Sequence, residues 1–127
     1  MPMIEVKKIK PINTDRRGSI IKVLEGKITS VLVIPSKKGA IRANHYHKKD
    51  SHYVYMLSGK MRYTVKDLTK KYARKQSIIL RTGDLIYTPP MVAHAMEFLD
   101  DSVFLALATE PRDQKHYEND TTKIELI

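Results

Sequence analysis

Short β-type segments alternate with turn residues along the whole chain, and this regular spacing restricts the fold more than any other feature. About ten runs rich in Val, Ile, Tyr and Thr are separated, roughly every ten residues, by Gly, Pro, Asp or Asn. Residues 19–24, 28–34 and 51–58 are typical examples. Only residues 67–73 favour a helix. The pattern predicts an all-β fold, an antiparallel sandwich or barrel, in a single domain spanning 1–127.

The length and composition limit the class of protein. A chain of 127 residues can bury one core but is too short for two ordinary domains. No apolar run approaches the length that crosses a bilayer, and no secretory signal is recognisable, so we expect a cytoplasmic protein with no membrane association. The absence of cysteine excludes disulfides and thiolate ligands. Any metal must therefore be held by imidazole or oxygen ligands.

The charge favours anionic partners. Lysine and arginine outnumber aspartate and glutamate by 23 to 14, which gives a formal net charge of +9. The basic residues form several small clusters, of which Lys48 and Lys49, next to His47, are best placed to contact a ligand. The sequence has no helix-turn-helix spacing, zinc-finger pattern or ribonucleoprotein motif, so we expect no nucleic-acid binding.

Four histidines are candidates for a functional site. His45 and His47 are two residues apart, so in a strand both imidazoles point to the same face. The same alternation places Arg42 on the opposite face. His52 follows in the next predicted strand, and His94 lies in a second stretch bounded by turn residues. Convergent histidines with an open position describe a catalytic metal site better than a closed structural one, with His45, His47 and His94 as ligands and His52 or water completing the shell.

Two segments resemble the sequence motifs of the cupins. In the first, residues 39–59, Gly39, His45, His47 and Gly59 match the pattern, and His52 stands at the usual carboxylate position. In the second, residues 83–98, Gly83, Pro89 and His94 match, while Met91 replaces a usual Gly and Phe98 a usual Asn. The resemblance implies a double-stranded β-helix, or jelly-roll barrel, with the histidines inside it.

A narrower resemblance points to the RmlC-like cupins of nucleotide-sugar metabolism, which include 3,4-ketoisomerases and 3,5-epimerases. It rests on residues 15–20, 42–48 and 104–120, with Ala43 in place of the Gly of the pattern Arg-Gly-x-His-x-His-Lys. In that group one histidine of the pair serves as the base, without metal in several members. The resemblance implies isomerisation or epimerisation of a nucleotide-linked 4-keto-6-deoxy sugar, an anionic small molecule.

This reaction assigns a role to each candidate residue. Removing the proton next to a sugar carbonyl needs a base, for which we choose His47, with His45 orienting it or holding a metal. Tyr63 is a candidate acid one strand away. Arg42 and Lys48 are candidates to pair with the diphosphate, Arg42 at the rim of the barrel or toward a partner subunit. Tyr117 is expected at the surface or the barrel edge.

Two other functions use the same pocket. A mononuclear cupin of the dioxygenase type would hold one divalent transition metal (Zn, Fe, Ni or Mn) at the histidines, whereas the isomerase works with or without one. A non-catalytic sugar-binding cupin would bind without reacting. Exposed sheet edges and apolar outer residues such as 28–34 favour a homodimer in each case.

Overall fold

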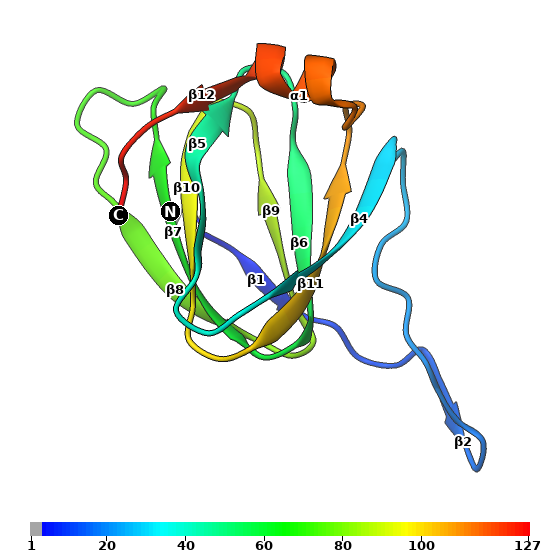
Figure 1. The fold of residues 1–127 in the computed structure, drawn as a ribbon. Helices are drawn as coiled ribbons and strands as arrows, with labels where there is room; N and C mark the ends of the chain where they lie inside the picture. Colours follow the sequence, from blue (N-terminus) through cyan, green and yellow to red (C-terminus); the bar gives the residue numbers. More distant parts are fainter. Residues whose placement is uncertain (1–3) are drawn as a thin grey trace.

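Two antiparallel sheets face each other and enclose the core of the molecule (Figure 1). The computed structural model describes residues 4–127. Its elements are β1 (Val6–Lys8), β2 (Asn13–Asp15), β3 (Gly18–Ile20), β4 (Ser30–Ser36), β5 (Ile41–His47), β6 (His52–Ser58), β7 (Lys60–Asp67), β8 (Gln76–Arg81), β9 (Asp84–Thr88), β10 (Val92–Phe98), β11 (Ser102–Ala108), α1 (Gln114–Asp120) and β12 (Thr121–Lys123). One sheet has the order β1-β9-β6-β11-β4 and the other β12-β5-β10-β7-β8. The predicted all-β fold is therefore confirmed.

Side-chain alternation divides the interior into an apolar end and a histidine end. In β10, Phe98 and Met96 lie on the same inward face as His94. In β6, Met56 and Val54 share the inward face with His52, which lies at the same end of the barrel as His94. The apolar end is closed by stacked aromatic rings such as Phe98 and Phe104, whose centroids are 5.8 Å apart. The hydrophobic core thus fixes the strands, and the strands carry the histidines at their other ends.

Two local predictions are wrong. Residues 67–73 form turns instead of a helix, because the Asp67 side chain accepts a hydrogen bond from the Thr69 amide, 2.9 Å away, and bends the chain. The helix is α1, whose N-cap Asp113 accepts from the His116 amide. Residues 19–24 do not form one strand. Only β3 is extended there, and it pairs with β2 in a hairpin that projects from the barrel (Figure 1).

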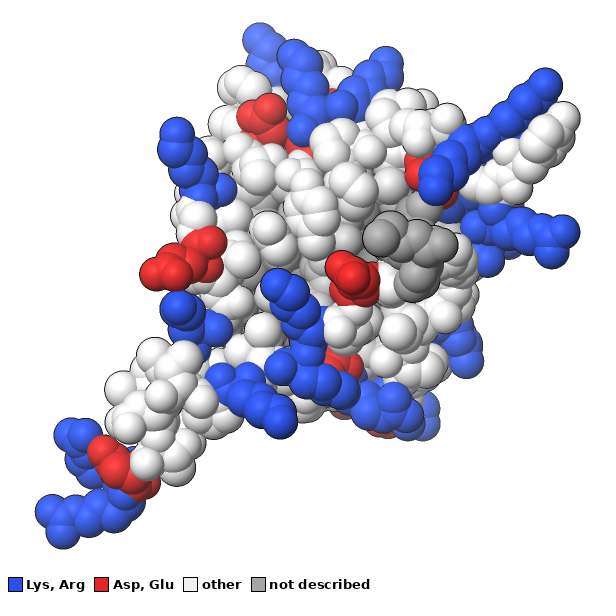
Figure 2. Space-filling view, turned by 180° about the vertical axis from the view of Figure 1, so that it is seen from behind, with Lys and Arg blue, Asp and Glu red and all other residues white. Residues whose placement is uncertain are grey.

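The surface charge is dispersed. Figure 2 shows lysine and arginine side chains around the whole outline of one face, with acidic groups between them. No helix within residues 4–127 combines the length and the apolar character needed for a membrane crossing.

Candidate active site

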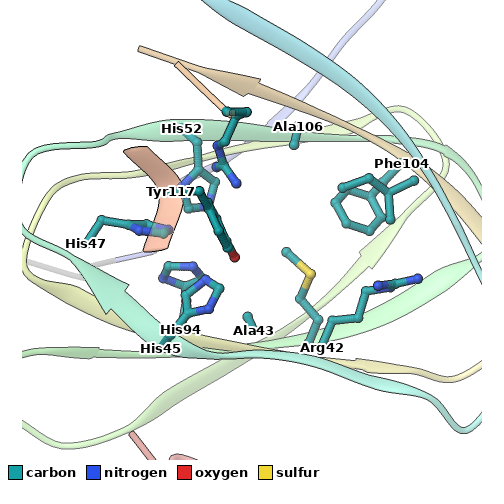
Figure 3. A pocket seen from close by; sticks show the side chains of 12 residues that line it. Arg42, Ala43, His45, His47, His52, His94, Phe104, Ala106 and Tyr117 are labelled. Carbon is teal, nitrogen blue, oxygen red and sulfur yellow. The ribbon is translucent and has the colours of Figure 1, made fainter. Parts of the chain in front are cut away.

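A cavity of 140 Å³ lies between the sheets at the histidine end, beneath α1 (Figures 1 and 3). It is lined by Ile34, Arg42, Ala43, His45, His47, His52, His94, Met96, Phe104, Ala106, Arg112 and Tyr117. These residues come from both sheets and from the segment that follows β11. The cavity therefore depends on the whole barrel and on its C-terminal cover.

The structure brings the four candidate histidines together in this cavity. The ring centroids of His45 lie 4.7 Å from those of His47 and of His94, and the centroids of His52 and His94 are also 4.7 Å apart. One nitrogen each of His45, His47 and His94 lies within 4.8 Å of the other two. Alternation along β5 and the antiparallel pairing of His94 with His45 produce this convergence.

All four imidazoles are neutral at neutral pH. Burial lowers the pKa of His45 to about 4, and the neighbouring His47 ring and the Arg112 charge act in the same direction. Burial also lowers the pKa of His94 to about 3, and lowers the pKa values of His47 and His52. Each ring therefore keeps a lone pair that can accept a proton or bind a metal.

Hydrogen bonds to main-chain oxygens fix the tautomers of two of these rings. The His47 Nδ1 lies 3.3 Å from the carbonyl oxygen of Asp120, and the His94 Nδ1 lies 3.0 Å from that of Val92. A carbonyl only accepts, so both Nδ1 atoms carry the proton and both Nε2 atoms carry the lone pair. The buried His47 Nε2 has no hydrogen-bond partner among residues 4–127. No residue of the described chain therefore uses its lone pair.

Of the two tyrosines considered in the sequence, Tyr117 lines the cavity and Tyr63 does not. Tyr63 is fully buried beyond His52, does not line the cavity, and places its hydroxyl 2.6 Å from the Thr88 hydroxyl. Burial raises its pKa, which keeps the phenol protonated. Tyr117, which the sequence placed at the surface or the barrel edge, is half-buried and lines the cavity. Its ring centroid is 5.8 Å from that of His47, and its hydroxyl points into the cavity (Figure 3).

Arg42 lines the cavity, although alternation predicted that it faces away from the histidines. Ala43 and Asn44 have φ values of 67° and 55°, and the pairing of β5 with β10 shifts register between His94 and Ala95. This bulge turns Arg42 to the same side as His45. Its Nε donates to the Ser36 Oγ at 2.7 Å, at the end of the cavity away from His47 (Figure 3).

Lys48 is not part of the cavity. It borders a separate surface hollow with Lys49, His116 and Asp120. Its amide donates to the Asp120 carboxylate. Of the two predicted ligands of the diphosphate, only Arg42 therefore lines the cavity.

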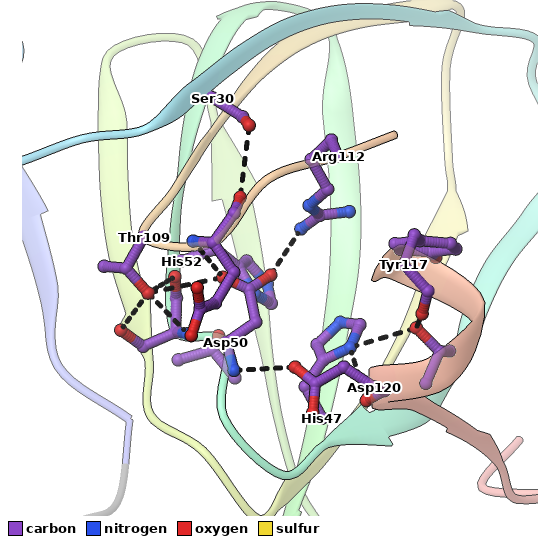
Figure 4. Close-up of polar contacts among 12 residues, drawn as sticks. Ser30, His47, Asp50, His52, Thr109, Arg112, Tyr117 and Asp120 are labelled. Atoms are coloured by element: carbon purple, nitrogen blue, oxygen red, sulfur yellow. Dashed lines mark hydrogen bonds and ion pairs between the residues drawn. The ribbon is translucent and has the colours of Figure 1, made fainter. Parts of the chain in front are cut away.

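The sequence-based reasoning missed three charged residues around the site (Figure 4). Arg112 enters the cavity and forms an ion pair with Asp50, 3.1 Å away. Asp120 accepts hydrogen bonds from three consecutive amides, those of residues 48–50. All three lie in polar loops or at a helix end, where no periodic pattern exists. The available signals are that Asp50 lies within the first cupin motif and that residues 104–120 belong to the segment of family resemblance.

The histidine set suits a divalent transition metal. His45, His47 and His94 are buried or half-buried, neutral and close enough for three nitrogen ligands. Asp50 also lies within 4.8 Å of His47 and His52, but its oxygens are bound to Arg112, Thr109 and the Glu110 amide. The carboxylate is thus already committed, and a metal would be held by imidazoles.

Comparison with known proteins places this geometry in a family. The model described as Cupin domain matches residues 31–110. No curated protein matches the sequence. A 3,4-ketoisomerase from Helicobacter canadensis has a similar structure, with a TM-score of 0.79, 21% identity and coverage of 95% of this chain and 90% of that one. The dTDP-4-dehydrorhamnose 3,5-epimerase of Sulfolobus tokodaii is also similar in structure, with a TM-score of 0.78 and 19% identity. The match covers 98% of this chain and 78% of that one.

A third similar structure has a higher sequence identity. The 3,4-ketoisomerase QdtA from Thermoanaerobacterium thermosaccharolyticum, a double mutant in complex with TDP, is 28% identical, with a TM-score of 0.76 and coverage of 97% of this chain and 89% of that one. Another QdtA mutant is in complex with TDP-4-keto-6-deoxyglucose. The family model covers well over half of the chain, and the barrel and its inward histidines agree with it: the chain belongs to the cupin family.

Proposed function

We propose that this cupin isomerises or epimerises a nucleotide-linked 4-keto-6-deoxy sugar, with His47 as the base. The observation that supports the proposal is that His47, whose Nε2 has no hydrogen-bond partner among the described residues, lines a cavity that Tyr117 also lines. QdtA, which binds TDP-4-keto-6-deoxyglucose, shares 28% identity over nearly the whole chain and supports the substrate class.

The chemistry follows from the states of the side chains. His47 takes the proton from the carbon next to the sugar carbonyl, and the electron pair moves onto the carbonyl oxygen to give an enediolate. Tyr117, whose hydroxyl points into the cavity, takes the acid role that the sequence suggested for Tyr63. His45 packs against His47 at 4.7 Å between ring centroids and keeps it in place.

The size of the cavity suits the reacting sugar alone. A volume of 140 Å³ corresponds to about ten water-sized spheres, enough for one hexose ring and too little for a nucleotide. The nucleotide must then extend outside, past the end where Arg42 lies. Arg42 is therefore our candidate to pair with the diphosphate. Lys48 borders the separate hollow beside α1 and is therefore not placed to contact a nucleotide that leaves the cavity at Arg42.

The test is proton exchange in deuterated water. We expect the protein to introduce deuterium next to the carbonyl of TDP-4-keto-6-deoxyglucose, observed by NMR. His47→Asn should slow exchange by about 10²–10⁴-fold, the usual contribution of a general base. His116→Asn, at an exposed histidine, is the matched control and should react like the wild type. Absence of exchange in the wild type would refute the proposal. Nucleotide binding without exchange would instead indicate a binding module.

A second candidate is a metal-dependent cupin of the dioxygenase type, because three imidazole nitrogens lie within 4.8 Å of one another. A metal bound to His45, His47 and His94 would supply Lewis-acid or oxygen chemistry. Elemental analysis of purified protein tests this idea, with His94→Gln as the variant that should lose the ion. Stoichiometric iron together with oxygen uptake would favour this function over the isomerase.

We also propose a homodimer. Val31 and Val33 on the outer face of β4 are each 61% exposed, and β4 is the edge strand of its sheet. An apolar edge of this kind favours pairing with a second copy. Sedimentation equilibrium should give twice the chain mass, and Val33→Glu should shift the protein to the monomer. A monomeric wild type would contradict the proposal.

A further inference from the structure

Arg112 is a buried cation beside the histidines. It lies in the loop between β11 and α1, and its side chain is 16% exposed. One terminal nitrogen lies 3.1 Å from Asp50 Oδ2, and the guanidinium carbon lies 5.0 Å from the centroid of the Tyr117 ring (Figure 4). Its Nε is fully buried and has no hydrogen-bond partner in the described part of the chain. The buried Nε is shielded, but Arg112 lines the cavity, and its guanidinium carries further N–H groups that can donate there.

Asp50 holds this guanidinium in place. The carboxylate is 4% exposed, and its Oδ1 accepts hydrogen bonds from the Glu110 amide at 3.1 Å and from the Thr109 hydroxyl at 3.3 Å. The same side chain thus fixes both the main chain before Arg112 and the guanidinium itself. A donor that is already held by an ion pair loses little conformational freedom when it forms a hydrogen bond to a ligand.

The field of Arg112 extends over the whole histidine group. Its charge contributes to the lowered pKa values of His45, His47, His52 and His94. The guanidinium charge therefore disfavours a proton on each of the four rings. Arg42, the other cation among the described lining residues, is exposed and lies at the opposite end (Figure 3).

We propose that Arg112 is a catalytic residue that stabilises the enediolate, with Asp50 as its positioning residue. The inference rests on the proposed isomerase or epimerase function. His47 Nε2 takes the proton from carbon, the C–H electron pair forms the carbon–carbon double bond, and the carbonyl electron pair moves onto oxygen. That oxygen accepts a hydrogen bond from a guanidinium N–H of Arg112 that faces the cavity.

The second half of the reaction restores all atoms and electrons. In epimerisation the Tyr117 hydroxyl gives its proton to the other face of the same carbon, and the proton on His47 is passed through solvent to restore the tyrosine. In isomerisation the proton on His47 goes to the other carbon of the enediol, while the Tyr117 hydroxyl passes a proton between the two oxygens. In both cases the oxyanion exists only between the two proton transfers. A donor placed at this oxygen therefore lowers the barrier more than it strengthens binding.

The test uses the full chain and TDP-4-keto-6-deoxyglucose. For Arg112→Gln we expect kcat for deuterium exchange to fall about 10²–10³-fold, as for the loss of one oxyanion donor, with the dissociation constant of TDP unchanged by calorimetry. Arg112→Lys keeps the charge without the planar fork and should fall between this variant and the wild type. Arg62→Gln, which breaks the surface pair with Glu97, is the matched control and should keep the wild-type rate.

Folding is controlled separately. Removing one partner of a buried pair leaves the other charge uncompensated, so thermal unfolding is measured for every variant. The double variant Asp50→Asn with Arg112→Gln removes both charges and should fold while remaining as slow as Arg112→Gln.

The outcomes separate the two proposals. Wild-type exchange together with an undiminished rate in folded Arg112→Gln or in the double variant would overturn the role of Arg112 alone. Loss of TDP binding with kcat retained would overturn it too and assign Arg112 to the nucleotide. A wild type that exchanges no proton would overturn the proposed function, and this inference with it.

Discussion

The Nδ1 atom of His47 lies 3.3 Å from the main-chain oxygen of Asp120, and the Asp120 carboxylate holds the loop that directly follows His47. Its oxygens accept from the amides of Lys48, Lys49 and Asp50 at 3.0, 2.9 and 2.8 Å. Burial alone would raise the pKa of Asp120, but these three amides lower it. One residue therefore orients the proposed base and anchors α1 to β5.

We expect Asp120→Asn to impair both stability and catalysis. An amide group has one acceptor oxygen, and its NH2 group would face the amide donors, so the free energy of unfolding should fall by about 1–3 kcal/mol. The exchange rate should fall as well, because His47 is held less firmly. Urea unfolding and deuterium exchange measure the two effects. The matched control is Asp101→Asn, whose carboxylate accepts from the Lys38 amide at an exposed loop. Equal losses in both variants would contradict the orienting role.

Tyr117→Phe and Tyr63→Phe should have opposite effects. Tyr117→Phe removes a hydroxyl that points into the cavity, so kcat should fall about 10²-fold or more while stability stays within about 0.5 kcal/mol. Tyr63→Phe leaves the buried Thr88 hydroxyl without its 2.6 Å partner and should cost about 1–3 kcal/mol of stability with little change in kcat. Deuterium-exchange kinetics measure the change in kcat of both variants, and urea unfolding measures the change in their stability. The reverse result would restore Tyr63 as the acid.

Two departures from the cupin motifs should carry backbone strain. Ala43 and Met91 stand where glycine is usual, and their φ values are 67° and 65°. The left-handed region costs a residue with a side chain about 1–2 kcal/mol, which exceeds the entropic cost of glycine of about 0.5–1 kcal/mol. We therefore expect Ala43→Gly and Met91→Gly each to raise the free energy of unfolding by about 0.5–1 kcal/mol. Ala40→Gly, at a residue outside the left-handed region, should lower the free energy of unfolding. A lower free energy of unfolding in all three variants would refute the explanation.

Stability should decline below neutral pH. The unfolded histidines have a pKa of about 6.5, whereas in the folded chain burial lowers that of His45 to about 4 and that of His94 to about 3. Between pH 6.5 and 4 the unfolded chain thus binds protons that the folded chain does not, and each such histidine costs up to about 1.4 kcal/mol per pH unit as the pH falls. Urea unfolding at pH 7, 6 and 5 measures this loss, and His94→Gln should reduce it. Constant stability over that range would contradict the prediction.

The sequence carried enough information for the barrel and for its histidines. Period-two alternation places His45 and His47 on one face, and the motif spacing brings His94 to the same barrel, so the convergence of the three follows from local rules. Arg42 shows where such rules stop. The bulge at Ala43 and Asn44 changes the alternation of side chains along β5. Neither residue is a glycine, so their amino-acid types do not indicate the left-handed backbone that forms the bulge.

The cover of the cavity depends on contacts between distant residues. Helix α1 has no buried residue, so its sequence lacks the apolar stripe that usually identifies a helix. It is placed by the Asp120 carboxylate and by the pairing of β12 with β5. Tyr117 and Arg112 reach the cavity only through this placement. No periodicity within residues 109–120 could have revealed them.

The pairing of β12 with β5 also has a consequence for biosynthesis. His47 leaves the ribosome 73 residues before Asp120 does, so β5 must wait as an open edge while most of the barrel is made. During that interval its unpaired amides and carbonyls are free to associate with a neighbouring nascent chain. Docking of β12 then both closes this edge and completes the reactive pocket.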